Sequence, residues 1–219
     1  MFVKVCCISS ADEITRALTF GVTALGFVSA MPSGPGPIPE DLIARLVPLV
    51  PPSVDTFLLT SLTKPESIAE QHARCGTSTI QLVDYLGPAA LQLLRELVPA
   101  ARLVQVVHVT GEASIDHVEE AAPFVHALLL DSGNPTAAQR ELGGTGRTHD
   151  WSVSAQICDA VDPLPVLLAG GLRAENVAQA IRQVQPFGVD VCSGIRTAGV
   201  LDPGKLGDFV RAARAPMLA

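Results

Sequence analysis

Short apolar runs rich in β-branched residues recur along the chain at nearly regular intervals. Most of these runs are continuously apolar and do not alternate between apolar and polar positions. That pattern is typical of strands buried on both faces, as in a parallel sheet that helices cover. It predicts eight strands, at residues 2–8, 24–29, 55–60, 79–83, 103–109, 125–131, 165–169 and 189–192.

The segments between these runs have the period and the end signals of helices. Apolar residues fall at i, i+3, i+4 and i+7 over residues 177–184, which is one face of a helix. Three helix starts carry capping residues, namely the capping boxes Ser10/Glu13 and Thr63/Glu66 and the pair Asp202-Pro203. Further helices are expected at residues 40–50, 88–98, 114–122 and 150–160.

Eight strand–helix units in one chain of 219 residues predict a single (β/α)8 TIM barrel domain over residues 1–219. A doubly wound open sheet is the alternative, because it is built from the same units. Eight repeats without a linker, a low-complexity tract or a change in composition favour the closed barrel.

Composition and charge narrow the classes of function. The chain is 48% apolar and 17% charged, and its 15 basic and 22 acidic side chains give a net charge of −7. No cluster of Lys and Arg stands out, which argues against a nucleic-acid partner. The longest apolar runs are far shorter than the ~18 residues of a membrane span, and no signal peptide is recognised. Because the five cysteines show no disulfide or Cys-x-x-Cys pattern, we expect a reduced, soluble, cytoplasmic protein.

Small residues follow the last two predicted strands, at the end of the barrel where active sites of this fold are built. Gly170 and Gly171 come after the seventh strand, and Ser193 and Gly194 come after the eighth. Their backbone N–H groups can approach an anion closely, and these two loops are the recurrent phosphate site of the fold. The alternative is that they only form tight turns. Gly146, after the sixth strand, could close over the same phosphate.

Two side chains at strand ends are candidates for acid–base chemistry. Asp131 ends the sixth strand, where its surroundings could raise its pKa and make it a general acid, unless it is only a cap or turn residue. Cys6, in the first strand, is either a thiolate base or nucleophile, or a small buried hydrophobe. Along an extended strand Lys4 and Cys6 point one way and Cys7 the other. His108 is the one histidine kept as a possible pocket residue, and no ligand pair predicts a metal site.

Motifs spread over the chain resemble those of the phosphoribosylanthranilate isomerase family. The segment Val3-Lys4-Val5-Cys6-Cys7-Ile8 is similar to the family's opening Val-Lys-Ile-Cys-Gly-Ile, with Cys7 in place of the glycine. Gln81-Leu82 is similar to the start of its Gln-Leu-His-Gly, and Leu129-Leu130-Asp131 to its Leu-Leu-Asp. The segments 143–146, 168–172 and 189–194 follow in the family's order and complete the set.

The resemblance implies a fold, an activity and residue roles. Such enzymes are (β/α)8 barrels of tryptophan biosynthesis that convert an N-phosphoribosyl aminoaldose into a 1-amino-1-deoxyketose phosphate, an Amadori rearrangement. By that resemblance Asp131 is the general acid, Cys6 is the general base and Gln81 belongs to the substrate pocket. The resemblance implies no metal and no redox cofactor. The expected partner is a small phosphorylated sugar-amine substrate, and a monomer or a homodimer is expected.

Two departures from the family pattern bear on the substrate. The family's Ser-Pro-Arg after the second strand, whose Arg would hold the anthranilate carboxylate, aligns with Gly34-Pro35-Gly36. The family's acidic residue after Ser-Gly-Ile is Arg196, a candidate to supply the missing positive charge. Replacing Gly36 by Arg is therefore expected to lower KM. Two alternatives stay open, a non-catalytic phosphosugar-binding barrel and an isomerase of a different phosphorylated substrate.

Overall fold

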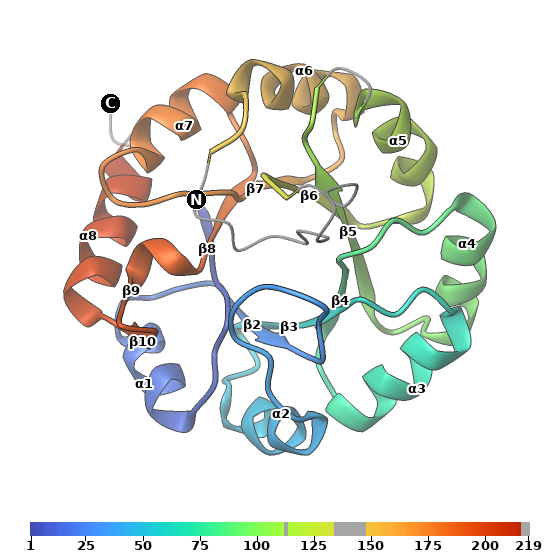
Figure 1. Cartoon of the computed structure of the whole chain (residues 1–219), viewed down its shortest axis with the longest axis horizontal. Helices are drawn as coiled ribbons and strands as arrows, with labels where there is room; N and C mark the ends of the chain where they lie inside the picture. The colour runs from blue at the N-terminus through green and yellow to red at the C-terminus, as the bar shows by residue number, and fades with distance from the viewer. Residues whose placement is uncertain (112–113, 134–147, 216–219) are drawn as a thin grey trace.

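The computed structural model describes residues 1–111, 114–133 and 148–215. Eight parallel strands close into a barrel in chain order, with β8 beside β1 (Figure 1). The strands are β1 Phe2–Val5, β2 Ala24–Val28, β3 Asp55–Thr60, β4 Thr79–Leu82, β5 Arg102–His108, β6 Ala127–Asp131, β7 Val166–Leu168 and β8 Gly188–Val191. The predicted (β/α)8 barrel is confirmed, and the open-sheet alternative is excluded.

Helices surround the barrel on its outside (Figure 1). In the described residues they are α1 Ala11–Thr19, α2 Glu40–Leu46, α3 Pro65–Cys75, α4 Pro88–Leu97, α5 Ser114–Ala121, α6 Trp151–Val161, α7 Val177–Val184 and α8 Pro203–Arg214. Between β8 and α8 lie a 3-10 helix, η3 Ser193–Ile195, and an antiparallel pair, β9 Arg196–Thr197 and β10 Val200–Leu201. Two further 3-10 turns, η1 Val47–Leu49 and η2 Ala122–Phe124, extend α2 and α5.

Two of the three predicted helix caps are confirmed. The side chains of Ser10 and Asp202 each accept backbone N–H groups from the first turn of the helix that follows. The prediction for Thr63 is wrong, because α3 begins at Pro65 and its N-cap is Lys64, whose side chain makes no capping bond. Proline suits the first helical position, since it has no N–H to satisfy and its φ is already helical, so the helix begins there.

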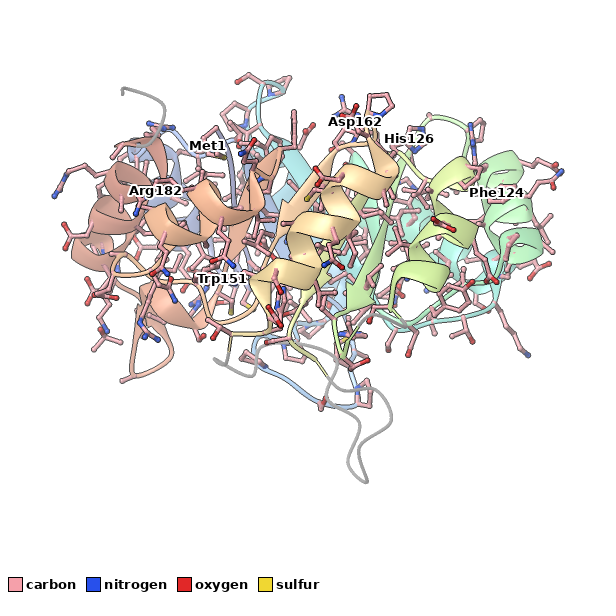
Figure 2. All side chains as sticks on the ribbon, turned by 90° about the horizontal axis from the view of Figure 1, so that it is seen from above. Met1, Phe124, His126, Trp151, Asp162 and Arg182 are labelled. Carbon is pink, nitrogen blue, oxygen red and sulfur yellow. The ribbon has the colours of Figure 1, made fainter. Side chains whose placement is uncertain are left out.

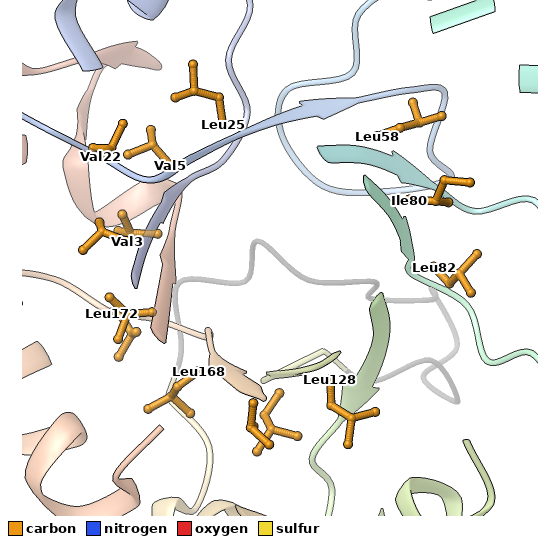
Figure 3. Close-up of a cluster of buried hydrophobic side chains, with 14 of the residues drawn as sticks. Val3, Val5, Val22, Leu25, Leu58, Ile80, Leu82, Leu128, Leu168 and Leu172 are labelled. Atoms are coloured by element: carbon orange, nitrogen blue, oxygen red, sulfur yellow. The ribbon is translucent and has the colours of Figure 1, made fainter. Parts of the chain in front are cut away.

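Apolar side chains on the outward face of the strands form the main core, between the barrel and its helices (Figure 3). Val3 and Leu25 are examples, and both are fully buried. A second cluster fills the inside of the barrel and includes Leu129 and Leu167. Because both faces of each strand are covered, the strands appear in the sequence as continuous apolar runs.

The strands and the helices begin at opposite ends of the barrel (Figure 2). Met1 and His126, which precede β1 and β6, lie at one end with Asp162, while Trp151 begins α6 toward the other. The C-terminal ends of the strands therefore meet at the end where the helices begin, which is the active-site end of this fold. None of the described helices is long and apolar enough to cross a membrane.

Candidate active site

A cavity opens at the C-terminal ends of the strands, and most of the predicted site residues line it. They are Cys6, Gln81, Asp131, Gly170, Gly171 and Ser193. Residues of the loop after β2, among them Ser33 and Pro35, form part of the wall. His108, Gly194 and Arg196 do not line the cavity, and Gly146 lies outside the described residues.

Asp131 ends β6 and directs a carboxyl group into the cavity. Burial is the main reason that the pKa of this carboxyl group is raised, and it outweighs the hydrogen bond that Oδ1 accepts from the Ser132 N–H at 2.7 Å. His108 is level with Asp131 on the neighbouring strand β5, and its Nε2 lies 3.1 Å from the Val83 carbonyl oxygen. His108 therefore contributes to the surroundings of Asp131 without lining the cavity.

Cys6 and Gln81 approach the cavity from other strands. Cys6 follows β1, and its backbone N–H bonds the Val191 carbonyl oxygen at 2.8 Å, which extends the β1–β8 ladder by one residue. Gln81 lies on β4 and is 3% exposed, and its Oε1 has no hydrogen-bond partner among the described residues. A buried acceptor without a partner costs free energy. We therefore expect Gln81 to accept a hydrogen bond from a bound molecule.

A buried ion pair reaches the cavity, because Asp190 lines it and pairs with Lys4, which does not. Lys4 is fully buried inside the barrel, with Nζ 2.9 Å from Oδ1 of Asp190 and 5.2 Å from the centroid of the Phe57 ring. Burial alone would lower the pKa of the Lys4 ammonium group, but the Asp190 carboxylate and the nearby thiols of Cys6 and Cys7 together outweigh burial, and the pKa is raised. The pair was not predicted, although the alternation that points Cys6 inward also places Lys4 on the inner face.

The two loops predicted to hold phosphate lie side by side at the cavity. Gly170 and Gly171 both have positive φ, +82° and +60°, and a Cβ on Gly170 would lie 3.0 Å from atoms of Ser132. Ser193 opens η3, where the Ile195 N–H donates to the Cys192 carbonyl oxygen at 3.4 Å and the N–H groups of Ser193 and Gly194 have no acceptor within the helix. A Cβ on Gly194 would overlap the Leu172 carbonyl oxygen, so a glycine is needed for the close approach of the two loops.

The whole chain matches one family of enzymes. The family model described as N-(5'phosphoribosyl)anthranilate (PRA) isomerase covers residues 3–212. This chain belongs to that isomerase family. The N-(5'-phosphoribosyl)anthranilate isomerase of Methanothrix thermoacetophila is 35% identical over an alignment of 219 positions that covers 97% of this chain and 98% of that protein.

Solved structures of the isomerase family share the fold. TrpF from Jonesia denitrificans is 30% identical, with a TM-score of 0.75 over 99% of this chain and 98% of that chain. A phosphoribosyl anthranilate isomerase in complex with reduced 1-(o-carboxyphenylamino)-1-deoxyribulose 5-phosphate is 25% identical, with a TM-score of 0.79 over 98% and 99% of the two chains.

The sequence suggested that Arg196, which stands where the isomerase family has an acidic residue, supplies a positive charge to the substrate. Its side chain does not line the cavity. Its Nη1 lies 2.6 Å from Oε1 of Glu13, and both side chains are buried. Its Nη2 donates to the carbonyl oxygens of Cys7 at 2.6 Å and Cys6 at 3.3 Å. The guanidinium group therefore holds the chain after β1 and is not free to bind a substrate carboxylate.

Cys7, which replaces the glycine of the isomerase motif, was predicted to point away from Cys6. This prediction is wrong, because Cys6 and Cys7 line the same cavity. The strand β1 ends at Val5, and Cys7 has a φ of +64°, so the alternation of an extended strand does not apply to it. Its sulfur lies 2.6 Å from the sulfur of Cys192, and both cysteines line the cavity. The residue is in the left-handed region that a glycine would occupy without cost.

Gly36, aligned with the arginine of the isomerase motif, packs directly on Cys7. Its φ is +86°, and a Cβ there would lie 2.6 Å from the Cβ of Cys7. An arginine at this position would be strained and would displace the loop, and this geometry argues against the expectation that Gly36→Arg lowers KM, which stays untested. Among the described residues, the site included, no group of three or more His, Cys, Asp or Glu side chains is arranged to hold a metal ion.

Proposed function

We propose that this protein catalyses the Amadori rearrangement of N-(5'-phosphoribosyl)anthranilate, with Asp131 as general acid and Cys6 as general base. The observation that carries the proposal is that these two side chains, from β6 and from the end of β1, line one cavity. Acid and base must reach the sugar from different sides, and strands far apart in the barrel provide this. Membership of the isomerase family supports the same reaction.

The environment of each group fits its step. Asp131 gives its proton to the furanose ring oxygen as the bond from that oxygen to C1 breaks, and the ring opens to a Schiff base. The raised pKa of Asp131 favours the protonated form that this step requires. The Cys6 thiolate then takes the proton from C2, and the resulting enolamine becomes the ketone.

The substrate phosphate is proposed to bind the backbone of Gly170, Gly171 and Ser193, which line the cavity, and of Gly194, which directly follows Ser193. Glycines with positive φ after β7 and a short helix after β8 support this assignment, because both allow N–H groups to converge on an anion. Sulfate is then expected to compete with the substrate. Gly194→Ala, which would force the two loops apart, is expected to raise KM and to weaken inhibition by sulfate. Inhibition equal to that of the wild type would contradict this site.

The catalytic roles are tested with Cys6→Ala and Asp131→Asn. Each change is expected to lower kcat by at least about 10²–10⁴-fold, because loss of an essential acid or base costs that much. Cys158→Ala, a cysteine outside the cavity, is the matched control and is expected to keep full activity. Circular dichroism and urea unfolding show whether each variant is folded. Turnover near that of the wild type in either folded variant would refute the assignment.

The loop after β2 favours a second candidate, an isomerase of a different phosphorylated substrate. Residues 34–36 carry no cation, and Arg196 is held by Glu13, so a carboxylate on the substrate has neither of these partners. Turnover of phosphoribosylanthranilate compared with a phosphoribosyl amine without a carboxylate separates the two candidates. If the protein binds both compounds but turns over neither, the remaining alternative is a non-catalytic phosphosugar-binding barrel.

A cytoplasmic location and a small-molecule partner follow from this proposal. A phosphorylated sugar-amine does not cross membranes freely, so an enzyme that uses it is expected in the compartment where it is made. Whether the protein is a monomer or a homodimer stays a prediction, which sedimentation of the purified chain would decide.

A further inference from the structure

We propose that Cys7 and Cys192 form a reversible disulfide bond that switches the site off under oxidation. The two residues follow neighbouring strands, since Val5 at the end of β1 lies opposite Val191 at the end of β8. That register places Cys192 level with Cys6, and the left-handed backbone at Cys7 is where the Cys7 sulfur meets the sulfur of Cys192. The two sulfurs, 2.6 Å apart, need to close by only about half an ångström to reach bonding distance.

The surroundings make Cys192 the reactive partner. The hydrogen bond shared with Cys7 lowers the pKa of the Cys192 thiol, burial opposes this, and the positive charge of Arg196 lowers it further. The hydrogen bond with Cys192 is the main reason that the pKa of the Cys7 thiol is raised, and the hydrogen bond with Cys6 and burial act in the same direction. Cys192 is therefore the sulfur that ionises first, and the thiolate is the form that oxidants attack. Both residues line the cavity, through which a small oxidant can enter.

The oxidant is proposed to be a peroxide. The Cys192 thiolate attacks one oxygen of hydrogen peroxide, the O–O bond breaks, and a sulfenic acid and hydroxide form. The Cys7 sulfur, losing its proton to that hydroxide, then attacks the Cys192 sulfur, and the S–O bond breaks with release of a second hydroxide that is protonated by solvent. Two thiols are oxidised by two electrons, and the peroxide is reduced to two water molecules. A dithiol reverses the bond by exchange.

The proposed disulfide bond would covalently link two segments of the candidate active site. Cys7 directly follows the proposed base Cys6, and Cys192 directly precedes Ser193 of the proposed phosphate loop. Cys7 also holds the loop after β2, because its thiol lies 3.5 Å from the Pro35 carbonyl oxygen and its Cβ faces Gly36. Shifts of about 1 Å at a catalytic group can cost about 100-fold in rate. The bond does not depend on the proposed function, but its effect on turnover does.

Mass spectrometry of peroxide-treated protein tests the bond itself. After free thiols are blocked and the chain is cut with trypsin, we expect the peptide 5–16 joined to the peptide 183–196. The link is expected to be absent in Cys7→Ser and in Cys192→Ser. It is expected to persist in Cys6→Ala and in Cys158→Ser, which are the matched controls. No link in the wild type, or a link that Cys6→Ala abolishes, would overturn the proposal.

Turnover before and after oxidation tests the switch. Wild-type activity is expected to fall by at least about tenfold with peroxide and to return with dithiothreitol. Cys192→Ser, compared with its own reduced activity, is expected to lose much less. A complete Cys7–Cys192 link with unchanged turnover would overturn the switch. If the reduced protein does not turn over phosphoribosylanthranilate, the proposed function fails, whereas the mass measurement still decides whether the bond forms.

Discussion

The ion pair between Arg196 and Glu13 is expected to stabilise the fold and not to bind substrate. Arg196→Met removes the guanidinium group and keeps most of the apolar stem. Glu13 keeps only its uncharged partners, the N–H and hydroxyl of Ser9 and the N–H of Leu201. The carbonyl oxygens of Cys6 and Cys7 lose the donor that holds the chain after β1.

The size of the loss follows from the burial of the pair. Both side chains are less than 10% exposed, 9% for Arg196 and 7% for Glu13. Removing one partner of such a pair costs about 3–5 kcal/mol, because the other charge stays buried without compensation. Because Glu13 keeps its hydrogen bonds with Ser9 and Leu201, we expect Arg196→Met to lower the free energy of unfolding by about 3 kcal/mol, the lower end of this range. An exposed pair contributes about 0–1 kcal/mol.

Urea unfolding at neutral pH measures this loss, with Arg211→Met as the matched control. Arg211 pairs with Asp208 on the surface, and its loss is expected to cost under about 1 kcal/mol. The double variant Glu13→Gln with Arg196→Met is expected to be more stable than the sum of the single losses predicts. The reasoning is refuted if Arg196→Met is as stable as Arg211→Met and instead raises KM in a salt-dependent way, since that would place the guanidinium group on the substrate.

Substitutions at two further positions, Gly36 and His149, test the loops at the end of the barrel. Gly36→Ala and Gly36→Arg are both expected to destabilise the protein by about 1–3 kcal/mol, because of the positive φ and the contact with Cys7. A lower KM for Gly36→Arg than for Gly36→Ala would show that the added charge reaches the substrate. Burial lowers the pKa of His149 to about 4, so between about pH 6.5 and pH 4 the unfolded chain binds a proton that the folded chain does not. Stability is expected to fall by about 2 kcal/mol from pH 7 to pH 5, and His149→Gln is expected to remove that slope. An unchanged slope would contradict the burial of a neutral imidazole.

The fold could be predicted because burial on both faces leaves a signal in every strand. The apolar runs and capping residues placed the eight strands and their helices in the right order. The strand boundaries were less secure, since the run at residues 2–8 continues apolar after β1 has ended at Val5. The capping box at Thr63 was wrong because Pro65 sets the first helical position. Such local choices depend on backbone geometry that hydrophobic periodicity does not report.

The candidate site could be predicted only where it depends on the ends of strands. Cys6, Gln81 and Asp131 line the cavity because parallel strands in a barrel end at one place. The ion-pair partner of a long charged side chain cannot be predicted from the positions of the strand ends. Nothing in the sequence pairs Arg196 with Glu13, which lies far away along the chain, and the ion pair of Lys4 with Asp190 depends on the closure of the barrel between β1 and β8.

The departures from the family motif are physically linked at the junction of β1 and β8. Cys7 occupies a left-handed position that costs a non-glycine residue about 1–2 kcal/mol. The guanidinium group of Arg196 donates to the Cys7 carbonyl oxygen at 2.6 Å and so helps to hold that conformation. The loop at Gly36 then has space only for a glycine, because the Cys7 side chain fills the place of an added Cβ. We therefore expect that a cysteine at position 7 favours an arginine at 196 and disfavours any side chain at 36, which would link the two departures that the sequence resemblance indicates.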